Sequence, residues 1–258
     1  MVTDRKLDER SVLGRAILIL ESFGVEDRAV GLSELARRTG LPKATVHRIS
    51  QDLAAARLLT ASAEGYRLGR GLFELGMRAA AERTLLEVAV PFLQDLYTRT
   101  GETVHLGVRD GDEVVYISKL GGHRQARSPS RVGGRMPLYC TAIGKALLAH
   151  SDPLTIDRIL TGPLPRRTPR TIVAPGLLRT QLEHILDQGI AYEYEESATG
   201  IVCLAAPILD GTDPVAAISV TGPATRFRPE SHAVPVRAAA TGIASILARR
   251  ATRNDPNS

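Results

Sequence analysis

The stretch 30–59, VGLSELARRTGLPKATVHRISQDLAAARLL, decides the fold of the N-terminal part of the chain. Its apolar residues recur at helical spacing on both sides of Thr39-Gly40-Leu41, which predicts two short amphipathic helices joined by a tight turn. Gly40 suits the left-handed conformation that ends a helix, and Pro42 suits the first position of the next one. Two helices joined in this way form a helix-turn-helix, a motif whose second helix lies in the DNA major groove.

The second helix of this pair separates apolar from polar side chains. Its apolar side is formed by Val46, Ile49, Ser50 and Leu53. The candidate DNA contacts on the other side and its flanks are Lys43, Ala44, Thr45, His47, Arg48 and Gln51. A solvated helix face would show the same separation. However, no Asp or Glu occurs between Lys43 and Gln51, so nothing in this stretch repels phosphate, and DNA binding is the favoured interpretation.

The residues around the motif complete a small domain. We expect Ser33 to cap the first helix through its hydroxyl, and we include it among the candidate DNA contacts. Two short extended runs, 58–61 and 65–68, predict a hairpin that would form the wing of a winged helix, with Arg67 placed to contact a phosphate or the minor groove. Upstream, residues 11–23 predict a third helix, whose core face would consist of Val12, Ala16, Ile19, Leu20 and Phe23.

A connector follows the wing. Residues 72–80 carry an apolar stripe with small residues, and a second stripe continues through 84–100. Pro91 lies inside the second stripe and predicts a kink or a break there, because it removes one helical hydrogen bond. The stripe from Leu72 to Leu96 has two interpretations that the sequence leaves open. It packs against its own domain, or it pairs with a second copy of the chain.

From Gly101 onward, short alternating strands are mixed with helical stretches. Val104, Leu106 and Val108 alternate with polar residues before a turn at 109–112, which predicts a hairpin. Helices are expected over 141–150, 155–160, 176–188 and 229–250, and further strands over 190–195, 202–208 and 215–221. Adjacent antiparallel strands with helices grouped between them predict an α+β domain.

Composition excludes several classes of protein. The 258 residues are 43% hydrophobic with a net charge of +5, a mildly basic balance that permits a nucleic-acid partner. No apolar run approaches the length of a membrane span, and residues 1–6 are charged with no apolar stretch behind them, so we expect a cytoplasmic protein without a secretory signal. The two cysteines, Cys140 and Cys203, form no CxxC or Cys/His cluster, and we therefore expect neither a metal nor a cofactor.

Several segments together resemble the IclR family of bacterial regulators. In the N-terminal part these are SVLGRAILILESF, LSELARRTGLPKATVHRISQDL and GYRLGRGLFELG. In the C-terminal part they are TGETVHLGVRDGDEVVYISKL, RVGGRMPLYCTAIGKALLA and the segment GIAYEYEESATGIVCLAAPI with the later AAISVTGP. The order and spacing of these segments match over roughly residues 10 to 250. Many regulators share a helix-turn-helix, so the C-terminal segments carry most of the specificity.

The resemblance implies an α+β multidomain fold. The expected domains are a winged helix-turn-helix DNA-binding domain over 8–70, a linker helix over 71–84 and an effector-binding domain over 85–251 with a GAF-like antiparallel sheet and helices. It implies a transcriptional regulator that binds a roughly palindromic double-stranded operator as a homodimer or homotetramer. A small organic carboxylate, aromatic acids included, is the implied effector.

The candidate effector-binding residues lie on a predicted helix and on three predicted strands. Thr141 can cap its helix, whose free first-turn N–H groups attract a carboxylate. Ser219 and Thr221 alternate on one strand, so both hydroxyls face the same side. By the family's motif, the site positions fall on Ala142, Ile143, Glu193, Cys203, Ser219 and Thr221. Better-known members carry Gly-Ala where this chain has Ala142-Ile143, and Asp and Ser at the positions of Glu193 and Thr221.

Each of these residues also has a simpler interpretation. Ser219 and Thr221 are equally compatible with a solvated strand surface, Glu193 with an exposed carboxylate and Cys203 with a small core residue. A Cys-dependent enzyme would need a histidine base beside Cys140 or Cys203, and no catalytic signature surrounds either. A winged-helix protein-interaction module is the remaining alternative. The acid-free stretch from Lys43 to Arg48 favours DNA over that alternative.

Overall fold

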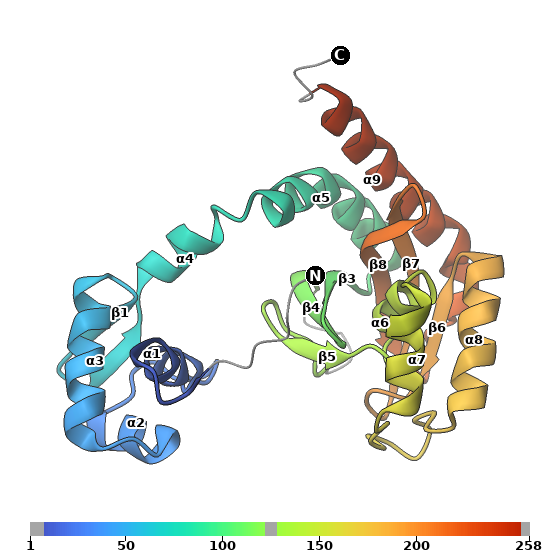
Figure 1. The fold of residues 1–258 in the computed structure, drawn as a ribbon. Coiled ribbons are helices and arrows are strands. Elements are labelled where there is room, and N and C mark those ends of the chain that lie inside the picture. The colour runs from blue at the N-terminus through green and yellow to red at the C-terminus, as the bar shows by residue number, and fades with distance from the viewer. Residues whose placement is uncertain (1–7, 122–127, 254–258) are drawn as a thin grey trace. The chain divides into compact units, whose positions relative to one another are not determined.

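The computed structural model describes residues 8–121 and 128–253, so the charged residues 1–6 lie outside the described part. The chain divides into two compact units, Met1–Arg83 and Thr84–Ser258 (Figure 1). Each unit has its own hydrophobic core, and each is described by itself. Across the described ranges, no helix is both long and apolar enough to cross a membrane.

The first unit is a winged helix-turn-helix. Its elements, in chain order, are α1 (Val12–Glu21), α2 (Leu32–Thr39), α3 (Lys43–Ala55), β1 (Leu59–Ser62), β2 (Gly65–Leu68) and α4 (Arg70–Gly76). The core is built from buried aliphatic side chains of α1, α2, α3 and β1, among them Ile19, Leu35, Val46 and Ile49. Val12, expected in this core, is 64% exposed because it starts α1 at the edge of the unit.

The turn between α2 and α3 forms as the sequence predicts. Gly40 adopts a φ of 69°, the left-handed conformation in which a side chain would be strained, and its N–H bonds the carbonyl of Ala36. The expected cap at Ser33 is wrong: Gly31 is the N-cap residue, and Ser33 is an exposed residue inside α2. Pro42 is the N-cap of α3 and the helix begins one residue later, at Lys43.

β1 and β2 form the expected hairpin. Leu59 pairs with Leu68 and Ser62 with Gly65, which leaves two residues in the connecting turn. Val30 bridges Tyr66 through two backbone hydrogen bonds of 2.7 and 2.9 Å, and so attaches the hairpin to the segment that precedes α2. The wing is therefore fixed to the helix-turn-helix by backbone contacts as well as by side-chain packing.

The connector is helical in two pieces. α4 ends at Gly76 and α5 (Ala80–Thr100) begins three residues after Met77. Pro91 lies inside α5 without ending it, so of the two expected outcomes, a kink or a break, the break does not occur. The apolar residues of α5, including Leu85 and Leu96, are buried in the core of the second unit, which supports the first of the two interpretations for this half of the stripe.

The second unit is built on a six-stranded antiparallel sheet, in agreement with the expected α+β class. Its strands are β3 (Thr103–Asp110), β4 (Glu113–Leu120), β5 (Arg135–Pro137), β6 (Ala191–Tyr194), β7 (Ile201–Asp210) and β8 (Asp213–Pro223). They lie side by side in the order β5-β4-β3-β8-β7-β6. The sequence did not predict β5, because three residues are too few to show an alternating pattern.

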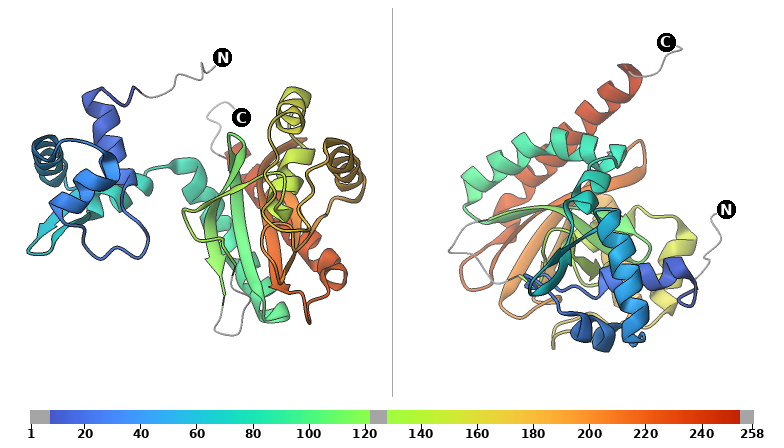
Figure 2. Two further views of the ribbon diagram at one scale, coloured as in Figure 1. Left: turned by 90° about the horizontal axis from the view of Figure 1, so that it is seen from below. Right: turned by 90° about the vertical axis from the view of Figure 1, so that its left-hand side faces the viewer.

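Helices cover both faces of this sheet (Figures 1 and 2). α5 and α9 (Ala233–Arg253) pack on one face, against residues such as Leu106, Leu204 and Ile218. α6 (Ala142–Ala149), α7 (Pro153–Thr161) and α8 (Pro175–Gln188) lie on the other face. The first residues of the helix expected over 229–250 form a short 3-10 turn instead, η1 (Pro229–His232), and the α-helix begins at Ala233.

Strand alternation decides which residues face α6. Val104 and Leu106 of β3 point toward α5 and α9, so His105 between them points toward α6. His105 pairs with Ser219, and Cys203 pairs both with Thr221 and with Glu193, so the same face carries all five. A row of polar side chains therefore lies beneath α6, next to the apolar residues of this core.

Candidate functional site

The first candidate site is the exposed face of α3. Lys43, Ala44, His47, Arg48 and Gln51 are exposed and Thr45 is half-buried. Val46, Ile49 and Leu53 on the opposite face are buried in the core of the first unit. The packing of the unit thus leaves the expected polar face turned to solvent.

Arg48 has one acidic neighbour. Its guanidinium lies 3.5 Å from the carboxylate of Asp52, one turn later in α3, and the two side chains are 60% and 69% exposed. Such exposed pairs contribute little free energy. Arg48 can therefore leave Asp52 for a phosphate or a base at small cost.

The arginines of α2 are occupied within the domain. Arg38 donates to Asp27 at 2.5 Å and to the carbonyl of Ser22 at 3.0 Å, and both Arg37 and Arg38 donate to Glu34. These hydrogen bonds lower the pKa of Glu34 to about 2. The pairing attaches α2 to the loop before it, whereas Arg67 on β2 and Ser33 on α2 are exposed.

The second candidate site is a small cavity between α6 and the sheet. All seven residues expected at the effector site line it: Thr141, Ala142, Ile143, Glu193, Cys203, Ser219 and Thr221. The structure adds His105, Tyr116, Ser128, Ser130, Ser197 and Ile201 to its wall. The cavity volume is ≈ 20 Å³, room for about one water molecule.

His105 is the centre of the polar cluster. Its Nε2 lies 2.8 Å from the Ser130 hydroxyl, and its Nδ1 lies 3.4 Å from the hydroxyls of both Ser219 and Thr221. Burial, with the nearby cation of Lys119, lowers the pKa of His105 to about 3. The imidazole is therefore neutral at physiological pH and offers one donor and one acceptor.

Glu193 is buried, unlike the exposed carboxylate of the simpler interpretation. Its Oε1 accepts from the backbone N–H groups of Glu196, at 2.6 Å, and Ser197, at 2.9 Å. Burial raises the pKa of Glu193 to about 7, although these two N–H groups act in the opposite direction. The group can thus change protonation state near neutral pH.

Thr141 caps α6 as predicted. Its hydroxyl accepts from the N–H of Gly144 at 3.0 Å and donates to the carbonyl of Pro137 at 3.1 Å. Ala142 and Ile143 form the first turn, whose N–H groups have no partner within the helix. The positive end of α6 therefore lies at the wall of the cavity.

The two cysteines are unsuited to nucleophilic catalysis. Burial raises the pKa of both Cys140 and Cys203 to about 12, so their thiols stay protonated. Cys203 Sγ lies 2.9 Å from the Thr221 hydroxyl and helps to form the cavity wall. Among the residues placed by the structure, no group of three His, Cys, Asp or Glu side chains could hold a metal ion.

Larger hollows lie elsewhere in the described part of the chain. One of ≈ 490 Å³ lies between α8 and β6, and another of ≈ 780 Å³ lies between the wing and α4. The first contains no residue expected at the effector site, and the second contains only Arg67 of the expected DNA contacts. The smaller cavity is the stronger candidate because its wall concentrates buried polar groups from several strands and from the cap of α6.

Sequence reasoning did not select His105, Tyr116 or Ser130. His105 stands between Val104 and Leu106, so alternation alone places it on the opposite face from them. Its pairing with Ser219, which places it in the cavity wall, depends on the β3–β8 register. The T-shaped contact of His105 with Tyr116 likewise depends on tertiary packing.

A winged helix-turn-helix joined to a sheet domain with a buried polar cavity defines a DNA-binding regulator with a ligand-binding domain. Two family models match the chain, the IclR helix-turn-helix domain over residues 12–62 and the bacterial transcriptional regulator IclR C-terminal domain over residues 77–245. The chain belongs to the IclR family of bacterial transcriptional regulators.

Individual relatives of known name also belong to this class of regulator. The HTH-type transcriptional regulator KdgR of Escherichia coli strain K12 is 37% identical over 231 residues, 88% of each chain. An IclR homolog from Microbacterium hydrocarbonoxydans, complexed with 4-hydroxybenzoate, is 31% identical with a TM-score of 0.88 over 93% of this chain and 100% of that one. IclR of Thermotoga maritima is 32% identical, with a TM-score of 0.76 over 91% of this chain and 98% of that one. The chain is thus a regulator and not an enzyme.

Proposed function

We propose that this regulator binds a roughly palindromic operator as a homodimer or homotetramer in the cytoplasm. The residues proposed to contact DNA are Lys43, Ala44, Thr45, His47, Arg48 and Gln51 of α3, with Ser33 of α2 and Arg67 of the wing. The exposed, acid-free first turns of α3 support the groove contact, because they present donors without repelling phosphate. A two-fold assembly would present two such helices to two half-sites.

We further propose that a small organic acid, aromatic acids included, binds at the α6 cavity. The observation that carries this proposal is the convergence of Thr141, Ala142, Ile143, Glu193, Cys203, Ser219 and Thr221 on one cavity wall. A carboxylate would accept from the free N–H groups of α6 and from the hydroxyls of Ser219 and Thr221. The related Microbacterium protein, complexed with 4-hydroxybenzoate, supports an acid of this class.

The size of the cavity suggests how binding would affect DNA. A volume of ≈ 20 Å³ is far below the several hundred Å³ of a typical ligand pocket. The acid would therefore bind an expanded form of the effector domain. By stabilising that form it would shift the population between arrangements that bind DNA and arrangements that do not.

Fluorescence anisotropy with the DNA upstream of the regulator's own gene tests the proposal. We expect salt-dependent binding that exceeds binding to a shuffled fragment of equal length. A thermal-shift screen of pyruvate, benzoate and 4-hydroxybenzoate, followed by titration into the DNA complex, tests the effector. Equal affinity for both fragments would contradict specific operator binding, and an acid that binds without altering DNA affinity would contradict effector control.

A further inference from the structure

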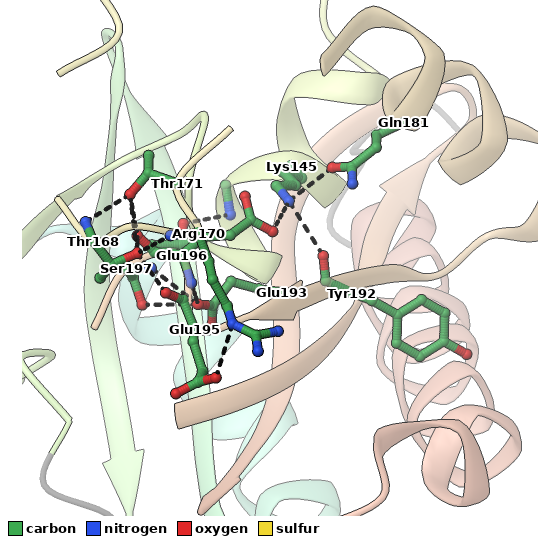
Figure 3. A network of polar contacts seen from close by, with 12 residues as sticks. Lys145, Thr168, Arg170, Thr171, Gln181, Tyr192, Glu193, Glu195, Glu196 and Ser197 are labelled. Carbon is green, nitrogen blue, oxygen red and sulfur yellow. Dashed lines mark hydrogen bonds and ion pairs between the residues drawn. The ribbon is translucent and has the colours of Figure 1, made fainter. Parts of the chain in front are cut away.

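A second polar network lies beside the cavity and outside its wall. Its centre is Lys145 of α6, whose side chain is completely buried. Lys145 Nζ lies 2.5 Å from Glu196 Oε1 and donates to Gln181 Oε1 at 2.8 Å and to the carbonyl of Tyr192 at 3.4 Å (Figure 3). Three acceptors thus match the three donors of the ammonium group, which is the condition for keeping such a charge in a protein interior.

Glu196 lies in a turn that follows β6. The turn begins at Glu195, whose φ of 57° is left-handed. The strand predicted over 190–195 therefore ends one residue earlier, at Tyr194. The hydroxyl of Thr171 donates to the carbonyl of Glu196 at 2.7 Å, and the hydroxyl of Thr168 donates to that of Glu195 at 2.6 Å. The loop before α8 therefore binds the backbone carbonyls of the turn. Lys145 of α6 binds the side chain of Glu196.

The N–H groups of the same turn hold Glu193. Glu196 N and Ser197 N donate to Glu193 Oε1 at 2.6 and 2.9 Å, and the Ser197 hydroxyl lies 3.3 Å from the same oxygen. One carboxylate oxygen of Glu193 is thus occupied by the turn. Glu193 itself lines the cavity, so a molecule bound there would lie beside a carboxyl group that the turn holds in place.

Lys145 connects two walls of the cavity. It stands one helical turn after Ala142, which lines the cavity from α6, and its partner Glu196 belongs to the turn that holds Glu193 on the opposite wall. Neither Lys145 nor Glu196 lines the cavity itself. A buried ion pair is weak evidence for stability, because its desolvation cost offsets its attraction. Its geometric effect is to join the turn to α6, in addition to the bonds that Thr168 and Thr171 make to the same turn.

From this geometry we infer that Lys145 and Glu196 are positioning residues for the effector site. Their ion pair holds residues 195–197 in the conformation whose N–H groups orient the Glu193 carboxyl at the cavity wall. The inference rests on the proposed effector function of the cavity. It assigns to Lys145 and Glu196 an effect on acid binding that passes through Glu193 and needs no contact with the acid.

The test uses the full-length protein and two variants. Glu196→Gln keeps the shape of the side chain and removes its charge. The double variant Lys145→Met with Glu196→Gln leaves no unpaired charge in the interior, and so it is the variant expected to fold if the single one does not. Arg179→Ala is the matched control, because Arg179 forms an exposed ion pair with Asp157 on the same side of the sheet.

The first measurement is hydrogen–deuterium exchange of a peptide that contains the N–H groups of Glu196 and Ser197. We expect these two amides to exchange about tenfold faster in the variants, because they lose their fixed bond to Glu193. Amides of β8 should keep their wild-type rate, which separates positioning from general loss of stability. Unchanged exchange at both amides, or equally faster exchange throughout β8, would overturn the inference without any acid being present.

The second measurement is calorimetry with pyruvate, benzoate and 4-hydroxybenzoate as probes. Any probe that binds the wild type should bind the variants about tenfold more weakly, because a polar contact at the site is misplaced. The Arg179→Ala control should bind it as the wild type does. Normal affinity in variants with fast exchange would overturn the inference and leave the cavity's function intact. If none of the probes binds the wild type, the proposed class of effector fails, and the exchange rates still decide the positioning role.

Discussion

Ser130 and His105 lie 25 residues apart in the chain, and their side chains meet at 2.8 Å in the cavity wall. Lys119 Nζ donates to the carbonyl of the same Ser130 at 2.6 Å. The contact fixes the imidazole so that its other nitrogen faces Ser219 and Thr221. Because the ring is buried and neutral, it can bond to a neighbour or a ligand without the cost of an unpaired interior charge.

The first prediction concerns the exposed face of α3. Lys43→Ala and Arg48→Ala should each weaken operator binding without unfolding the protein, because both side chains are exposed. If Lys43 contacts a phosphate, its loss should lower the slope of log K against log salt by about one unit and affect all sequences alike. Anisotropy titrations at several salt concentrations measure both effects.

The control for this prediction is Arg99→Ala. Arg99 forms an exposed pair with Asp95 on α5, outside the helix-turn-helix, and its loss should leave operator affinity unchanged. If both α3 variants bind the operator as the wild type does, α3 does not lie in the groove.

The second prediction concerns the wing. Gly65 has a φ of +129°, and a Cβ there would lie 2.3 Å from the carbonyl oxygen of Val30. Gly65→Ala should therefore cost roughly 1–3 kcal/mol of stability in the DNA-binding domain. Gly76→Ala is the matched control, since its added Cβ meets no atom within 4 Å beyond its chain neighbours and the nearby backbone of α4. Thermal unfolding followed by circular dichroism compares them, and equal midpoints would show that the wing tolerates the distortion.

The third prediction concerns assembly. Phe73, Leu75 and Met77 are 73%, 51% and 43% exposed, so three large apolar side chains at and just after α4 are left uncovered by their own unit. Burial of apolar side chains drives association, so the protein should be a dimer or tetramer in solution. Light scattering at micromolar concentration measures the mass, and Phe73→Glu should reduce it. A monomeric wild type would contradict the prediction.

The fourth prediction concerns the effector cavity. If the carboxylate is oriented by Ser219 and Thr221, Ser219→Ala should lose roughly 1.5–3 kcal/mol of binding, which is about ten- to a hundredfold in affinity. Ala142→Phe should block the site by filling it, and Cys203→Ser should be milder because the thiol belongs to the wall. Calorimetry with an acid identified by thermal shift measures each affinity.

Operator binding without the acid is the control for these variants, and it should stay close to wild type because the substitutions lie in the effector domain. An acid that binds wild type and Ser219→Ala equally would place the effector site elsewhere. Loss of every response in Cys203→Ser alone would favour a redox or covalent role for that cysteine.

The fifth prediction concerns pH. Burial raises the pKa of Glu193 from its ordinary 4.5 to about 7 in the folded state, so unfolding releases a proton between these values. The native state then binds more protons than the unfolded state, and stability falls as pH rises through this window, by up to about 1.4 kcal/mol per pH unit. Glu193→Gln cannot titrate. Its stability relative to wild type should therefore rise from pH 4.5 to 7.

Chemical denaturation of both proteins across this pH range measures the difference, because groups that titrate in both cancel. Above pH 7 the difference should become constant. A difference that is constant over the whole range would show that Glu193 keeps an ordinary pKa.

Local patterns in the sequence determined the elements. The helical spacing of 30–59 predicted α2, α3 and their turn, because Gly40 and the apolar residues act within a few positions of one another. Alternation predicted most strands of the effector domain, and Thr141, as a capping residue, predicted the start of α6. Helix capping selected Thr141, and the family resemblance selected the other six expected residues of the α6 cavity, without showing that they meet.

Tertiary structure decided which of these residues meet and in what state. The β3–β8 register places His105 against Ser219, and no local pattern encodes a pairing across more than a hundred residues. The ion pair of Lys145 with Glu196 depends on a helix and a turn that only the folded sheet brings together. Burial then makes His105 neutral and moves the pKa of Glu193 toward neutrality, because desolvation is a property of the whole fold and not of a neighbouring sequence.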